Sequence, residues 1–215
     1  MEQEMSVRYS EFEWRTAGSA NGDSGAALAR AFIGIIEGLG GIKRICDLGC
    51  GNGYLAAKLA ALGYEVTGVD ASTSGIETAR RNCGQARFVL SEVDGQLDQV
   101  IETGTFDLVV SGDVIEHLYR PTDLLETASR LLRHDGQILI SAPYHGYLKN
   151  LALSLSGKMD AHFCALQDGG HIKFFSVKTL SKLIEQQGFT DIRISFFGRA
   201  PWLWKNMICH ARKSD

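Results

Sequence analysis

Long hydrophobic runs are missing from this sequence. No uninterrupted apolar stretch among its 215 residues approaches the roughly 20 residues that a membrane-spanning helix needs. The most apolar segment, residues 31–42, is interrupted by Glu37 and four glycines. The N-terminus is acidic, whereas a secretory signal begins with basic residues. We therefore expect a cytoplasmic protein that does not enter the membrane.

Paired cysteines and an excess of basic residues are missing as well. The five cysteines are odd in number and form no Cys-x-x-Cys pair, so we expect small buried hydrophobic side chains in a reducing compartment. The formal net charge of −3 gives no general attraction to nucleic acid and leaves only a local basic patch as a route to it. The expected partner is a small-molecule substrate, and the oligomeric state stays open.

What the sequence does contain is a glycine-rich turn at residues 45–54. Residues 42–48 are typical of a buried parallel strand, and the apolar residues after position 54 recur at helical spacing. Gly49, Gly51 and Gly53 therefore lie at a strand-to-helix turn, where the missing Cβ atoms let a ligand contact the backbone. The next predicted strand, residues 64–69, is followed by Asp70, whose carboxylate can accept hydrogen bonds from ribose hydroxyls. This half of the chain is predicted to bind a nucleoside.

The spacing disfavours a dinucleotide. An NAD-binding fingerprint needs glycine or alanine where Tyr54 stands, and Asp47 would repel an incoming pyrophosphate. The pattern Asp47-x-Gly49-x-Gly51-x-Gly53 instead resembles the first motif of class I S-adenosylmethionine (SAM)-dependent methyltransferases. The resemblance implies that Asp47 helps to hold the methionine ammonium, that the glycines face the nucleoside and that Asp70 binds the ribose.

The same resemblance implies a fold and further cofactor contacts. The fold is a Rossmann-like, doubly wound α/β sheet of seven strands, mostly parallel, with an antiparallel hairpin at the C-terminus. Past the third strand, residues 86–90, the adenine would be contacted by Glu92 and Val93. The remaining cofactor-binding residues implied by the resemblance are Ala71 and Ser111.

A second motif follows the fourth predicted strand, residues 106–111. The run from Gly112 through Glu116, His117 and Leu118 to Pro121 resembles the branch of this family that contains the ubiquinone O-methyltransferases. A helix over residues 122–132 that stops at Gly136, a strand over 137–142, a helix capped by Ser176, and two strands over 190–197 and 203–211 complete the prediction.

We predict one methyltransferase domain over residues 1–215. It consists of an N-terminal lid and helix (1–40), the SAM-binding core (41–143), a substrate-side insertion (144–172), and a C-terminal helix with the hairpin (173–215). The insertion follows a strand at the carboxyl edge of the sheet, where open α/β sheets bind ligands. The substrate residues expected are Trp14, Tyr144 and Tyr147, although Trp14 is equally consistent with an anchor for the N-terminal tail.

Methyl transfer needs a base only if the acceptor carries a proton. The histidines that follow the sheet strands or the insertion, His117, His145 and His171, are the candidates, although each one alone is more often structural. Relatives with an acid-x-x-Glu-His motif and a later histidine hold a divalent cation, so Asp113, Glu116, His117 and His171 are candidate ligands for Mg²⁺ or Zn²⁺. The alternative is that Glu116 and His117 only orient the following helix.

The sequence thus predicts a SAM-dependent methyltransferase that methylates a hydroxyl on a small molecule, with aromatic hydroxyls among the acceptors considered. Three alternatives stay open. They are an RNA 2′-O-methyltransferase with a divalent metal, a small-molecule N-methyltransferase, and a catalytically inactive SAM-binding protein.

Overall fold

The computed structural model describes residues 23–93, 97–163, 166, 169–199 and 201–214. Its centre is one seven-stranded sheet in the order β3-β2-β1-β4-β5-β7-β6, in which β1 to β5 run parallel and β7 runs antiparallel to both neighbours. The fold prediction is confirmed. The strands are β1 (Arg44–Leu48), β2 (Glu65–Asp70), β3 (Arg87–Leu90), β4 (Phe106–Ser111), β5 (Leu132–Pro143), β6 (Phe189–Phe197) and β7 (Asn206–Lys213).

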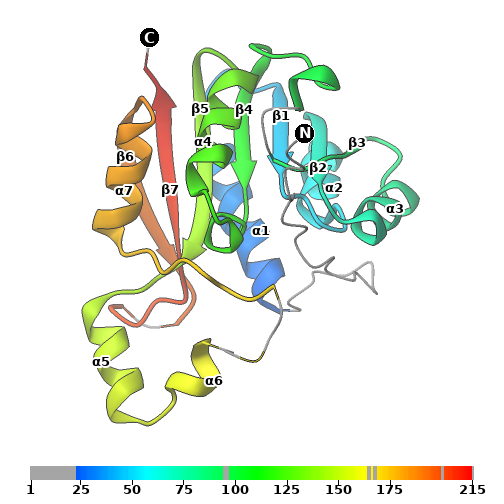
Figure 1. Cartoon of the computed structure of the whole chain (residues 1–215). Helices are drawn as coiled ribbons and strands as arrows, with labels where there is room; N and C mark the ends of the chain where they lie inside the picture. The colour runs from blue at the N-terminus through cyan, green and yellow to red at the C-terminus, as the bar shows by residue number, and fades with distance from the viewer. Residues whose placement is uncertain (1–22, 94–96, 164–165, 167–168, 200, 215) are drawn as a thin grey trace, which may run out of the picture.

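Helices cover both faces of this sheet (Figure 1). α1 (Asp23–Ile36), α2 (Tyr54–Ala61) and α3 (Thr73–Asn82) bury apolar side chains against one face, and α4 (Pro121–Leu131) and α7 (Val177–Gln186) do so on the other. The central strands are buried on both sides, which explains their nearly continuous apolar sequence. Two 3₁₀ turns, η1 (Leu97–Gln99) and η2 (Ile115–His117), lie in the connections beside β4.

Two predicted boundaries are wrong. The helix expected to stop at Gly136 ends at Leu131, because Leu132 already pairs with Phe106 and a bulge then shifts the register so that Leu108 pairs with Gln137. The last strand begins at Asn206 rather than at residue 203. The residues before it belong to the connection from β6, because the Lys205 amide donates to the Phe197 carbonyl at 3.2 Å and to the Gly198 carbonyl at 3.0 Å and so closes that turn.

The predicted insertion follows β5. It contains α5 (Tyr147–Leu155) and α6 (Met159–Phe163), which lie beyond the carboxyl ends of the parallel strands, at the bottom of Figure 1. No helix of the described chain combines the length and hydrophobicity needed to cross a bilayer. Four cysteines are buried and unpaired, as expected: Cys46, Cys50, Cys83 and Cys209.

Candidate functional site

The glycine turn after β1 has the backbone conformation that the sequence predicts. Gly49, Gly51 and Gly53 have φ angles of +79°, +54° and +76°. A Cβ atom on Gly53 would lie 2.7 Å from the Ala79 Cβ and 2.9 Å from the Phe88 ring. The turn therefore needs glycine for its left-handed backbone and for close packing on α3 and β3. This packing holds the N-terminus of α2 against the edge of the sheet.

Asp70, at the end of β2, is the acid that binds this turn. Its Oδ2 accepts a hydrogen bond from the Gly51 amide at 2.7 Å, and its Oδ1 accepts one from the Ser72 amide at 2.8 Å. Burial raises the pKa of this carboxyl, and the two amides oppose the rise. Asp70 thus fixes the glycine turn beside the edge where a ribose would bind.

Asp47, at the carboxyl end of β1, is the second acid beside the turn. The residue is 2% exposed, and its Oδ2 is buried without a hydrogen-bond partner among the described residues. Burial, followed by the charge of Asp70, raises the pKa of this carboxyl to about 7. A buried carboxylate oxygen without a partner is costly, and an ammonium group would satisfy it. The residues present therefore fit the amino-acid end of SAM.

The other predicted cofactor residues lie at or near the carboxyl ends of the same strands, and none of their contacts assigns them a role in cofactor binding. Ala71 and Glu92 are exposed, and Val93 packs partly against the core. Ser111 is buried, and its Oγ donates to the Leu48 carbonyl at 2.8 Å, a bond that ties the end of β4 to β1. Cofactor binding by these four residues stays a prediction.

The motif after β4 begins with an acid that is held by other parts of the sheet. Asp113 has a positive φ of 55°, and its carboxylate accepts hydrogen bonds from Ser141 Oγ at 2.6 Å and from Asn206 Nδ2 at 2.7 and 2.8 Å. The Asp113 amide donates to Ser141 Oγ at 2.9 Å. Burial raises the pKa of this carboxyl, while the Ser141 and Asn206 bonds oppose the rise. In this arrangement Asp113 anchors the loop to β5 and β7.

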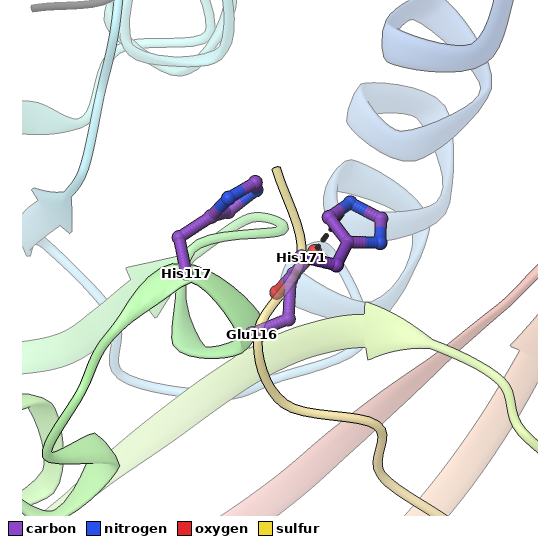
Figure 2. Close-up of side chains that lie close together, drawn as sticks. All are labelled: Glu116, His117 and His171. Atoms are coloured by element: carbon purple, nitrogen blue, oxygen red, sulfur yellow. Dashed lines mark ion pairs between the residues drawn. The ribbon is translucent and has the colours of Figure 1, made fainter. Parts of the chain in front are cut away.

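The next three candidates do come together. One potential ligand atom from each of Glu116, His117 and His171 lies within 4.8 Å of the other two, and Figure 2 shows the two histidines on either side of Glu116. Asp113 is not part of this group. The loop that carries His171 is joined to η2 because the Ile172 and Lys173 amides both donate to the Glu116 carbonyl at 2.9 Å.

Glu116 is the buried member of the cluster. It is 0% exposed, and neither carboxyl oxygen has a hydrogen-bond partner among the described residues. Burial, and then the Asp113 charge, raises its pKa well above the usual range, while burial lowers the pKa of His171 to about 4. The 3.8 Å separation of His171 Nε2 and Glu116 Oε1 therefore lies between two groups in each of which burial disfavours the charged form.

His117 has one ring nitrogen assigned by its partners. Its Nδ1 lies 2.8 Å from the Gly169 carbonyl oxygen and 3.2 Å from that of Gly170. Carbonyl oxygens only accept hydrogen bonds, so Nδ1 carries the hydrogen and the neutral ring keeps its lone pair on Nε2. A histidine in this state can accept a proton or bind a cation.

The remaining predicted residues are not members of this cluster. His145 is 8% exposed and packs among His162, Phe163 and Phe174, with ring centroids 5.2 to 5.8 Å away. The Tyr144 ring packs edge-on against Phe196 and Trp204. Tyr147 is 79% exposed on α5, and Trp14 lies outside the described residues.

Sequence reasoning missed the residues that hold the motif in place. Asn206 is 93 positions from Asp113, and no local pattern connects them. The carbonyls of Gly169 and Gly170 act through the backbone, for which side-chain identity is no guide. Lys149, at 3% exposed, was also overlooked, because a lysine on a short helix is ordinarily solvated.

Comparison with known proteins identifies the family. A family model described as a methyltransferase domain matches residues 19–194. A ubiquinone biosynthesis O-methyltransferase of Caulobacter sp. (strain K31) is 35% identical over 116 residues, 53% of this chain and 46% of that protein. One of Ruegeria sp. (strain TM1040) is 31% identical over 165 residues, 75% of this chain and 66% of that protein. The chain thus spans about half to two thirds of these curated relatives.

Solved structures share the fold at low sequence identity. A SAM-dependent methyltransferase from Archaeoglobus fulgidus has a TM-score of 0.67 at 19% identity, over 86% of this chain and 93% of that one. A phosphoethanolamine N-methyltransferase from Haemonchus contortus, solved with phosphomonomethylethanolamine and S-adenosylhomocysteine, has a TM-score of 0.63 at 18% identity. That match covers 86% of this chain and 53% of the other.

Proposed function

The chain belongs to the SAM-dependent methyltransferases, and we propose that it methylates a hydroxyl group of a small molecule, with His117 as the general base. The observation that carries this proposal is the pair of carbonyl contacts to His117 Nδ1, because they leave Nε2 able to take a proton. The relatives named ubiquinone biosynthesis O-methyltransferase favour oxygen as the acceptor atom.

Each residue has a separate task in this proposal. When bound, SAM supplies an electrophilic methyl group on a sulfonium. Asp47 pairs with the ammonium of the methionine part, and Asp70 holds the glycine turn and the ribose. His117 Nε2 accepts the hydroxyl proton. The acceptor oxygen would then bond to the methyl carbon as the carbon–sulfur bond breaks, and the sulfur would leave with that electron pair as the neutral thioether of S-adenosylhomocysteine. Holding both reactants in line contributes much of the rate in such a displacement.

A divalent cation at the same cluster is the second candidate. It is favoured by the donor set, one buried carboxylate without partners and two imidazoles, whose ligand atoms lie within 4.8 Å of one another. The Nδ1 contact of His117 to a carbonyl is also how metal-binding histidines are commonly oriented. A carboxylate with two histidines suits Zn²⁺ better than Mg²⁺, which prefers oxygen ligands. There the cation would lower the pKa of the acceptor hydroxyl.

A screen for methyl incorporation tests the choice of acceptor. Phenol, catechol, carboxylate, amine and short RNA acceptors would be incubated with the protein and SAM labelled in its methyl group. The proposal expects label on a phenolic or alcoholic oxygen. Label on nitrogen only, or on RNA only, would contradict it, and SAM binding without transfer to any acceptor would favour the inactive alternative.

A further inference from the structure

Lys149 is a buried cation without an acidic partner. It lies in the first turn of α5, is 3% exposed, and donates from Nζ to the Tyr144 carbonyl. Within the described part of the chain no carboxylate lies within ion-pair distance of it. Burial, followed by the charges of Arg199 and Lys205, lowers the pKa of its ammonium to about 8. Buried lysines are rare unless they are paired, because removing the charge from water is costly.

The surroundings of Lys149 add positive charge. The Tyr144 amide donates to the Lys205 carbonyl at 3.0 Å, and the Lys205 amide donates to the Gly198 carbonyl at 3.0 Å. These bonds bring the connection between β6 and β7, with Arg199, beside Tyr144, whose own carbonyl accepts from Lys149, and the charge of Arg199 is felt at Lys149. The first turn of α5 has no acidic residue, so the partial positive charge of that helix end adds to the charges of Lys149 and Arg199. An anionic group would be stabilised by this arrangement.

An unsatisfied buried histidine lies next to this charge. Neither ring nitrogen of His145 has a partner with full hydrogen-bond geometry among the described residues, although the Asn150 side chain lies close enough to act on the ring as a weak partner. Its pKa is lowered to about 4 by burial and then by Lys149, while the neighbouring Asn150 amide opposes the shift only in part. The ring stacks on Phe163 at 5.8 Å and meets the Phe174 ring edge-on at 5.2 Å. The Phe163 and Phe174 rings thus form two aromatic walls beside the buried ring nitrogens of His145, and such a mixture of apolar surface and unsatisfied polar atoms is typical of a ligand subsite.

This subsite adjoins the cluster proposed to perform the chemistry. The His145 amide donates to the Phe175 carbonyl at 3.1 Å, and the same loop is joined to Glu116 by the Ile172 and Lys173 amides at 2.9 Å. α5 and α6 both lie beyond the carboxyl ends of the strands, on the side where the acceptor must enter (Figure 1).

We propose that Lys149, supported by Arg199, binds an anionic group of the methyl acceptor, a carboxylate or a phosphate, beside the aromatic walls of His145, Phe163 and Phe174. The inference rests on the proposed function, because it describes the acceptor of that same site. It assigns the acceptor to the class of anionic hydroxylated compounds with a planar or aromatic part. The anion supplies the partner that Lys149 lacks, and the hydroxyl is then directed towards His117.

The test uses ligands without an alcohol or phenol hydroxyl, so that binding is measured separately from methyl transfer. Calorimetry would measure the binding of three ligands to the full chain saturated with S-adenosylhomocysteine. Two are anions, benzoate and phenyl phosphate, and benzamide is the neutral comparison. The variants are Lys149→Met, which keeps the length of the side chain without its charge, and Arg199→Gln on the surface. Lys158→Met, an exposed lysine of the same insertion, is the matched control.

The wild type is expected to prefer at least one anion over benzamide by about tenfold or more, as a charge-assisted hydrogen bond implies. Lys149→Met should remove that preference, Arg199→Gln should reduce it severalfold, and Lys158→Met should leave it unchanged. The tighter of the two anions distinguishes carboxylate from phosphate. No anion preference in the wild type, or the same preference in a folded Lys149→Met protein, would overturn the subsite.

Two further outcomes are decisive. If Lys149→Met no longer binds S-adenosylhomocysteine, Arg199→Gln decides, and an unchanged anion preference in that variant overturns the proposal. If the acceptor screen gives no O-methylated product but the anion preference and its loss in Lys149→Met are found, the subsite stands and the proposed function fails.

Discussion

The Nδ1 atom of His117 lies 2.8 Å from the carbonyl oxygen of Gly169, a residue 52 positions further along the chain. This contact joins the turn after β4 to the loop that follows the insertion, and it assigns the hydrogen of the neutral ring to Nδ1. The loop that brings His171 to Glu116 therefore also fixes the tautomer of the neutral His117 ring. A change in the 169–175 loop is expected to alter catalysis without touching the glycine turn.

The pH dependence of SAM binding should report on Asp47. Its pKa of about 7 in the unbound protein falls when an ammonium binds, so binding favours the ionised carboxylate. From about pH 7 down to about pH 5.5 the affinity should fall by at most about tenfold per pH unit, and Asp47→Asn should bind more weakly with a flatter profile. Calorimetry at several pH values measures both, and a wild-type affinity that is constant over this range would contradict the role of Asp47.

Stability should be more sensitive to Gly53 than to another glycine with a positive φ. Gly53→Ala adds the strain of a left-handed backbone and forces the new Cβ towards Ala79 and Phe88, so we expect a loss of about 2–4 kcal/mol in the free energy of unfolding. Gly63→Ala is the matched control, with φ +93° and no atom within 4 Å of the new Cβ. It should lose only about 1–2 kcal/mol. Equal losses in urea unfolding would show that the packing of the turn contributes nothing.

Removing the hydroxyl of Ser141 should disturb the motif after β4. Ser141→Ala takes one hydrogen-bond partner from the Asp113 amide and one from its carboxylate, and should lower the free energy of unfolding by about 1–3 kcal/mol. Because Asp113 positions the turn that carries His117, kcat should fall while the affinity for SAM is kept. Ser195→Ala, on an exposed position of β6, is the control and should match the wild type. A Ser141→Ala protein with wild-type stability and kcat would remove this anchoring role.

Chelation separates the two candidate roles of the cluster. With His117 as the base, turnover should survive treatment with a chelator, and elemental analysis of the active protein should find less than one equivalent of bound metal. Activity that is lost on chelation and restored by Zn²⁺ or Mg²⁺ would assign the cluster to a cation instead. His171→Ala should then abolish the restoration.

The sheet and the glycine turn were predictable because their signals are local. Apolar runs that end in Asp47 and Asp70, with glycines between, specify a strand, a turn and a helix within a few residues. The resemblance of the later motif to known methyltransferases added the antiparallel hairpin, and β7 does lie antiparallel between β5 and β6.

The parts that sequence reasoning missed depend on distant contacts. Asp113 was expected among metal ligands, but its carboxylate accepts hydrogen bonds from Ser141 and Asn206, and this pairing exists only once β5 and β7 are adjacent. The early end of the helix at Leu131 follows from strand pairing with Phe106, which overrides helical periodicity. Likewise, the burial of Lys149 depends on how the insertion packs, which helical periodicity does not show.

The most direct test of the central claim is the rate of methyl transfer by His117→Gln to the best hydroxyl acceptor found in the screen. The exposed His134→Gln is the matched control. If Nε2 of His117 takes the acceptor proton, kcat of His117→Gln should fall by about 10²- to 10⁴-fold, while SAM affinity and the His134→Gln rate stay at wild-type values. A His117→Gln protein that keeps the wild-type kcat on that acceptor would contradict the account.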